Sequence, residues 1–153
     1  GWHRDFGKLP RDGSEEVELE ILNRPMVSLK WHLPLVDDSC LKLVPGTNKR
    51  YRTEEEQNAL LNDRNGSLST GKVIHLKAGQ SCFWNGYMIH QGIYLKDVER
   101  LTLAGSWRKY QADDEPGEVD PRHRWQLDER VRNALPEGMK IPYDRWRALQ
   151  IDY

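Results

Sequence analysis

The most regular pattern of apolar and polar residues lies between residues 26 and 36. The odd-numbered positions are apolar: Val27, Leu29, Trp31, Leu33 and Leu35. The even-numbered positions are polar or proline: Ser28, Lys30, His32 and Pro34. Strict alternation over this length predicts a half-buried strand. We expect Pro34 to mark an edge strand or a bulge. His32 is expected at the surface or behind a site rather than as a metal ligand.

Shorter alternating segments follow, separated by turn residues. We expect strands at 41–44, 72–77, 81–84, 87–90 and 99–110. In the last of these, three apolar residues share one face: Leu101, Leu103 and Trp107. Many short strands without a βαβ rhythm predict a mainly-β sandwich or jelly roll.

Helices are predicted between and after the strands. Residues 17–22 fit either a short strand or a helical turn, and Pro25 ends that element. The run from Thr53 to Glu56 matches a capping box and predicts a short helix to about Asn62.

Near the C-terminus, Asp120-Pro121 predicts a helix start, with aspartate as the N-cap and proline at the first helical position. Three apolar residues then recur at helical spacing: Leu127, Val131 and Leu135. They predict one amphipathic helix over 121–135. A last short helix is expected over 143–150, with Trp125 and Trp146 as core anchors.

The composition narrows the class of protein. The 153 residues suit one domain, and six Trp and six Tyr supply enough apolar surface for a core. A net charge of −1 gives no basic surface for nucleic acid, and no long apolar run predicts a membrane span. No signal peptide is visible, so we expect a cytoplasmic protein. Without a CxxC pair, Cys40 and Cys82 are expected to be free thiols rather than zinc ligands.

The first candidate for chemistry is His3-Arg4-Asp5. In an extended strand, residues i and i+2 point to the same face, so His3 and Asp5 can reach one metal ion. A second imidazole would complete the two-histidine, one-carboxylate set of non-heme iron oxygenases. We expect His90, at the end of a predicted strand, to supply it.

Arg100 follows ten positions after His90, with Thr102 on the same strand face. An arginine fork binds a carboxylate through two hydrogen bonds, and a threonine hydroxyl donates one more. This pair would suit the remote carboxylate of a dicarboxylate co-substrate bound to the metal.

Four segments together resemble the phytanoyl-CoA dioxygenase family of iron(II)/2-oxoglutarate-dependent dioxygenases: WHRD, LPLVDDSCLKLVPGTNK, KAGQSCFWNGYMIHQG and ERLTLAGSWR. The resemblance covers roughly residues 2–108. That family usually has a Pro-Gly-Ser-His turn and a Gly-Asp turn. This chain has Pro45-Gly46-Thr47-Asn48 and Gly79-Gln80 instead, and neither change touches the predicted metal ligands.

The resemblance implies a mainly-β chain of one domain, residues 1–153. Its double-stranded β-helix (jelly-roll) core would be residues 1–112, with a helical extension at 113–153. His3, Asp5 and His90 would hold Fe(II), and Arg100 and Thr102 would bind 2-oxoglutarate. With O2, a C–H bond of a small-molecule substrate would be hydroxylated, releasing succinate and CO2. The carboxylate of Asp5 favours hydroxylation, because related halogenases lack it.

Family members usually carry an N-terminal strand and helices before the first ligand. These are missing here, so we expect either part of a longer protein or an unusually small member. One alternative is an inactive or non-oxygenase cupin-like domain that binds a metal or a carboxylate. Another is an interaction domain without a metal. Neither the substrate nor the oligomeric state is specified by the motifs.

Overall fold

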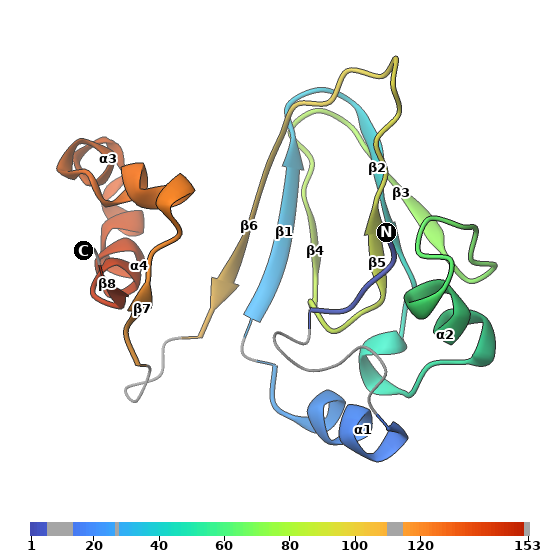
Figure 1. Ribbon diagram of the computed structural model, residues 1–153. Coiled ribbons are helices and arrows are strands. Elements are labelled where there is room, and N and C mark those ends of the chain that lie inside the picture. Colours follow the sequence, from blue (N-terminus) through green and yellow to red (C-terminus); the bar gives the residue numbers. More distant parts are fainter. Residues whose placement is uncertain (6–13, 27, 110–114, 152–153) are drawn as a thin grey trace. The chain divides into compact units, whose positions relative to one another are not determined.

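The computed structural model describes residues 1–5, 14–26, 28–109 and 115–151. The chain divides into an N-terminal unit, Gly1–Arg108, and a C-terminal unit, Lys109–Tyr153. Each is described by itself below (Figure 1). Val27 of the predicted strand, and the boundary predicted at residue 112, lie outside the described residues.

The described residues of the N-terminal unit form two three-stranded antiparallel sheets. In the first sheet, β1 (Ser28–Pro34) lies between β4 (Cys82–Trp84) and β6 (Thr102–Arg108). In the second sheet, β2 (Asp38–Leu43) lies between β3 (Lys72–Leu76) and β5 (His90–Gly92) (Figure 1). Because β1 is a central strand, the edge position predicted from its proline is wrong. Pro34 is tolerated there because it is the last residue of the strand, beyond the pairing with β4.

The two faces of β1 are buried in an unexpected way. His32 and Pro34, on the even-numbered face, are buried, whereas the apolar residues Leu29, Trp31 and Leu33 are only partly covered. The reason is that His32 points toward the second sheet, where it meets Asp38 of β2. His32 is therefore a buried residue behind the site rather than a surface residue.

The opposite face of this sheet carries exposed apolar side chains. They come from β4, β6 and the strand ends: Leu35, Phe83, Leu101, Leu103 and Trp107. Within this face the indole of Trp31 lies across Gly105, its cross-strand partner. A Cβ atom on Gly105 would come within 2.9 Å of that ring. Glycine is thus required there by the close approach of the indole.

Two clusters of buried residues form the core of this unit. One lies between the sheets and is built on Leu41, Leu43 and Trp84, with Ile74, Cys82 and Met88 packed against it. The other surrounds the N-terminus and contains Trp2, Val44, Ala59, Leu60, Leu68 and Ile89. Cys40 and Cys82 are both free.

The part of the N-terminal unit that the structure describes includes two α-helices. The segment around 17–22 is helical: α1 spans Glu15–Asn23, and the Ser14 side chain caps it by accepting a hydrogen bond from the Val17 amide. The predicted capping box is confirmed at α2 (Glu54–Leu61), where Thr53 and Glu56 each bind the other's backbone amide. A 3-10 turn, η1 (Thr47–Lys49), joins β2 to this region.

Residues 115–151 of the C-terminal unit form three helical segments and a small parallel pair of strands. The helix start at Asp120-Pro121 is confirmed, but one helix over 121–135 is wrong. A 3-10 helix η2 (Pro121–Leu127) and α3 (Glu129–Ala134) are separated at Asp128. That residue is extended, and its side chain accepts a hydrogen bond from the Arg130 amide, so it caps a new helix instead of continuing the first.

The last helix, α4 (Glu137–Arg147), begins earlier than residue 143 and contains Pro142. Trp146 packs on Tyr143, with ring centroids 5.7 Å apart, but Trp125 is exposed, so its prediction as a core anchor is wrong. Strands β7 (Gly117–Glu118) and β8 (Gln150–Ile151) pair in parallel. None of the helices in the described residues is both long enough and apolar enough to cross a membrane.

Candidate metal centre

His3 and His90 meet because the N-terminal segment pairs with the start of β5. The amide of each residue donates to the carbonyl of the other, both at 3.0 Å, in an antiparallel bridge. Directly paired residues of an antiparallel bridge point to one face, so the two rings lie together, with centroids 4.1 Å apart. His90 begins a strand rather than ending the one predicted at 87–90. A turn at Asn85, which accepts from Tyr87 and Met88, interrupts that segment.

Asp5 joins the two histidines through the strand geometry expected from its spacing. Its amide donates to Gly86 O at 2.9 Å, which keeps the segment extended beyond His3. Asp5 Oδ1 is 3.6 Å from His3 Nε2, and Oδ2 is 3.9 Å from His90 Nε2. One ligand atom from each of the three residues lies within 4.8 Å of the other two, so this group could hold a metal ion.

Hydrogen bonds fix the tautomer of both imidazoles. Nδ1 of His3 is 2.8 Å from Gly1 O, and Nδ1 of His90 is 2.8 Å from Met88 O. A carbonyl oxygen only accepts, so each Nδ1 carries a proton, and in the neutral ring each Nε2 carries a lone pair. Two lone pairs and a carboxylate thus converge, which is the arrangement of a cation site with oriented histidine ligands.

Burial and charge also fit a divalent cation. Burial lowers the pKa of His90 from its usual value, and the neighbouring His3 acts in the same direction. His90 is therefore neutral and able to bind a metal at neutral pH. Asp5 Oδ2 is buried and accepts no hydrogen bond from the described residues, although Lys30 Nζ forms an ion pair with it at 3.0 Å.

The residues that alternate with the ligands hold this segment in place. Trp2 is fully buried, and its Nε1 donates to Gly66 O at 3.0 Å. Arg4 donates to the carbonyls of Thr47 and Tyr87 and forms an ion pair with Glu18 at 3.2 Å. Burial lowers the pKa of Arg4 to about 10, which leaves it protonated at neutral pH.

Glu18 brings α1 into this arrangement. Its second oxygen lies 3.5 Å from Arg52 Nε, so one buried carboxylate faces two buried guanidinium groups. The sequence prediction missed this support of the metal segment. The signal was the alternation in residues 2–5, where Trp2 and Arg4 occupy one face and the ligands the other.

Arg100 and Thr102 lie together, but around Asp38. Asp38 Oδ2 accepts from Thr102 Oγ1 at 3.0 Å and from Arg100 Nε at 3.3 Å, and it lies 3.3 Å from His32 Nε2. Burial acts to raise the pKa of Asp38, but hydrogen bonds from the Cys40 amide, Thr102, Arg100 and His32 outweigh it and hold the pKa below its usual value. Asp38 was not predicted as a site residue.

The register of β2 shows how the two groups of side chains are arranged. Leu43 of β2 pairs with His90, whereas Asp38 is the first residue of the same strand. Asp38 and Leu43 are five positions apart on β2, with a register shift between Asp38 and Leu41. Arg100 is partly exposed and lies over the ring of Tyr94, 4.8 Å from its centroid. Two groups of side chains therefore lie at different positions along β2. The metal triad (His3, Asp5 and His90) lies near Leu43, and the Arg100 group (Arg100, Thr102 and Asp38) lies at the start of the strand.

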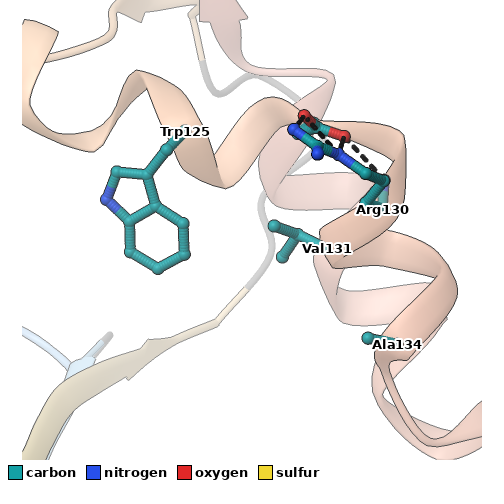
Figure 2. A pocket seen from close by; sticks show the side chains of 5 residues that line it. Trp125, Arg130, Val131 and Ala134 are labelled. Atoms are coloured by element: carbon teal, nitrogen blue, oxygen red, sulfur yellow. Dashed lines mark hydrogen bonds and ion pairs between the residues drawn. The ribbon is translucent and has the colours of Figure 1, made fainter.

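A separate pocket of about 380 Å³ lies in the C-terminal unit. Its lining residues are Trp125, Asp128, Arg130, Val131 and Ala134. Figure 2 labels four of these residues, Trp125, Arg130, Val131 and Ala134. Arg130 forms an ion pair with Asp128 at 2.6 Å. The pocket contains none of the predicted site residues.

In comparisons with known proteins, the chain matches no protein-family model and no curated protein.

Proposed function

We propose that this chain is an iron(II)- and 2-oxoglutarate-dependent dioxygenase of the phytanoyl-CoA dioxygenase family. In the reaction, 2-oxoglutarate, O2 and a small molecule with an unactivated C–H bond give succinate, CO2 and the corresponding alcohol. Bound Fe(II) supplies the redox chemistry with O2. We further propose that the two antiparallel sheets belong to a double-stranded β-helix and that the enzyme acts in the cytoplasm.

One observation carries this proposal: the Nε2 atoms of His3 and His90 and a carboxylate oxygen of Asp5 lie close enough together to bind the same cation. Histidine and carboxylate ligands in a 2:1 ratio suit non-heme iron and leave further coordination positions for a co-substrate. His3 is about one-third exposed, with its side chain at 35%, so ligands have access from solvent. His90, in contrast, is buried and is held by hydrogen bonds to Met88 and His3.

Arg100 is proposed to bind the remote carboxylate of 2-oxoglutarate. Thr102 would assist by turning its single hydroxyl proton from Asp38 to that carboxylate. Asp38 fixes both side chains from the buried side, through Arg100 Nε and the Thr102 hydroxyl. Burial acts to lower the pKa of Arg100, but contacts with Tyr94 and Asp38 outweigh it and raise the pKa, so the guanidinium stays charged.

A second candidate is a cupin-like domain that binds a metal without oxidation. Asp38 favours it, because its charge already balances that of Arg100. A site whose arginine is neutralised gains less from a second carboxylate. Both candidate functions include a metal bound by His3, Asp5 and His90, but only the first includes 2-oxoglutarate as a co-substrate.

The decisive experiment is anaerobic loading with Fe(II), followed by 2-oxoglutarate and O2, with succinate as the readout. We expect wild type and His75→Ala to form succinate and His90→Ala to form none. His75 is a matched control because it lies exposed on β3 and binds Ser39. Iron binding by wild type without succinate formation would favour the second candidate, and absence of iron binding would contradict both.

A further inference from the structure

Lys30 places a positive charge directly at the metal triad. Its Nζ lies 3.0 Å from Asp5 Oδ2, and its side chain is one-third exposed. It stands on the face of β1 that looks toward the second sheet, between Trp84 of β4 and Ser106 of β6. Neither cross-strand neighbour is acidic, so Asp5 is the carboxylate that Lys30 pairs with here.

Gly86 leaves the space that this ion pair occupies. A Cβ atom at that position would come within 2.9 Å of Asp5 Oδ2 and 3.4 Å of Lys30 Cε. The Gly86 carbonyl also accepts from the Asp5 amide, so the same residue holds the backbone of the ligand. The lysine is therefore fitted against the triad rather than lying loosely beside it.

The net charge at the metal triad would differ from the net charge of the Arg100 group. Around Asp38, one carboxylate balances one guanidinium. At the triad, a divalent cation, one carboxylate and two neutral histidines would carry a net charge of +1, and Lys30 would raise it to +2. Because Asp5 would then bind the cation through one of its oxygens, its single negative charge would be shared between the cation and the ammonium. An anionic ligand at this end would restore the balance.

We propose that Lys30 binds the carboxylate adjacent to the oxo group of a 2-oxo acid at the metal. This rests on the proposed function and adds a second anion-binding residue to it, at the end opposite Arg100. A lysine ammonium suits this position because it is a compact point charge with three donors. Lys30 Nζ pairs with Asp5 Oδ2, and we expect it to contact the oxo acid as well when one is bound.

The role of Lys30 is tested by Lys30→Met, with Lys72→Met as the control. Lys72 lies exposed on β3 and gives the same change in net charge. Mn²⁺ serves as a redox-stable probe, and titration calorimetry measures its affinity. The affinities of pyruvate and 2-oxoglutarate are then measured on the Mn²⁺-loaded proteins. Pyruvate isolates the oxo-acid end because it lacks the remote carboxylate.

Lys30→Met should shift the two affinities in opposite directions. It removes a cation from beside the metal and from Asp5, so Mn²⁺ should bind several-fold tighter. Both oxo acids should bind roughly tenfold to a hundredfold weaker, since each loses a charge-assisted hydrogen bond. Lys30→Arg should keep most of the oxo-acid binding, and Lys72→Met should behave as wild type. A general structural defect would weaken both affinities together.

The outcomes separate this inference from the proposed function. If wild type binds Mn²⁺ but neither oxo acid, the proposed function and the role of Lys30 both fail. If wild type binds both acids and Lys30→Met binds them equally well, only the role of Lys30 fails. Equal losses in Lys30→Met and Lys30→Arg would also overturn it, because packing rather than charge would then be responsible.

Discussion

His3 and His90 are 87 positions apart, yet each donates its backbone amide to the other's carbonyl at 3.0 Å. This single bridge aligns two imidazoles whose Nδ1 atoms are both tied to backbone carbonyls. The ligand geometry is therefore set by backbone pairing rather than by side-chain packing alone. Residues that hold the backbone near the His3–His90 bridge should therefore affect metal-ligand geometry as strongly as the ligands themselves.

Glu18 is the first such residue. Glu18→Ala removes the buried carboxylate that Arg4 and Arg52 share, and breaking a buried ion pair by removing one partner costs about 3–5 kcal/mol. We expect a loss of that order in the free energy of unfolding, measured by urea denaturation. Glu16→Ala, on the exposed part of α1, should change it by less than about 0.5 kcal/mol. Equal effects of the two changes would show that the Arg4–Glu18 contact is unimportant.

Gly105 tests the packing of the first sheet. A Cβ atom in Gly105→Ala would meet the Trp31 ring at 2.9 Å, so the indole must move, and we expect a loss of about 1–3 kcal/mol in the free energy of unfolding. Gly92→Ala is the matched control, because its nearest contact would be 4.0 Å away. Thermal and urea unfolding of both variants measure the difference. An unchanged stability for Gly105→Ala would contradict the position of Trp31.

Asp38 gives a prediction on pH. Its pKa is held below its usual value of about 3.8 by its donors, so the folded state binds fewer protons than the unfolded state in this range. The stability that it contributes is present above about pH 4 and is lost as the pH falls through the lowered pKa. Asp38→Asn should flatten the decline of unfolding free energy between about pH 4 and 2. If the unfolding free energy of Asp38→Asn falls with pH as it does in wild type, the Asp38 carboxylate is not the source of that fall.

Arg100 is predicted to discriminate between two oxo acids. Arg100→Ala should weaken 2-oxoglutarate binding to the metal-loaded protein by about tenfold to a hundredfold and leave pyruvate binding unchanged. Arg108→Ala, at the far end of β6, serves as the control and should bind both as wild type does. Loss of 2-oxoglutarate binding in Arg108→Ala but not in Arg100→Ala would reverse the assignment.

The sequence predicted the parts of the site that depend on local geometry. His3 and Asp5 share a face because strand side chains alternate, and Arg100 and Thr102 do so for the same reason. The proximity of His3 to His90 came from the resemblance to a family and not from any local pattern. The partner of Arg100 was missed, because Asp38 lies 62 positions away and only the stacking of the two sheets brings it near.

The burial of β1 illustrates a second limit. Alternation shows that two faces differ, but not which face the rest of the chain covers. In this chain the second sheet covers His32, whereas apolar residues such as Leu103 remain half exposed. The helix predicted at 121–135 failed for a local reason. Asp128 was treated as one helical position, although its carboxylate competes for backbone amides and starts a new helix.

Metal binding at the triad is the central claim, and titration with Mn²⁺ tests it most directly. Wild type should bind one ion per chain, and His75→Ala should bind it with the same affinity. His3→Ala should bind it more than about a hundredfold more weakly, because it removes a ligand whose orientation the Gly1 carbonyl fixes. His3→Ala that binds Mn²⁺ as tightly as wild type, or wild type that binds none, would contradict the account.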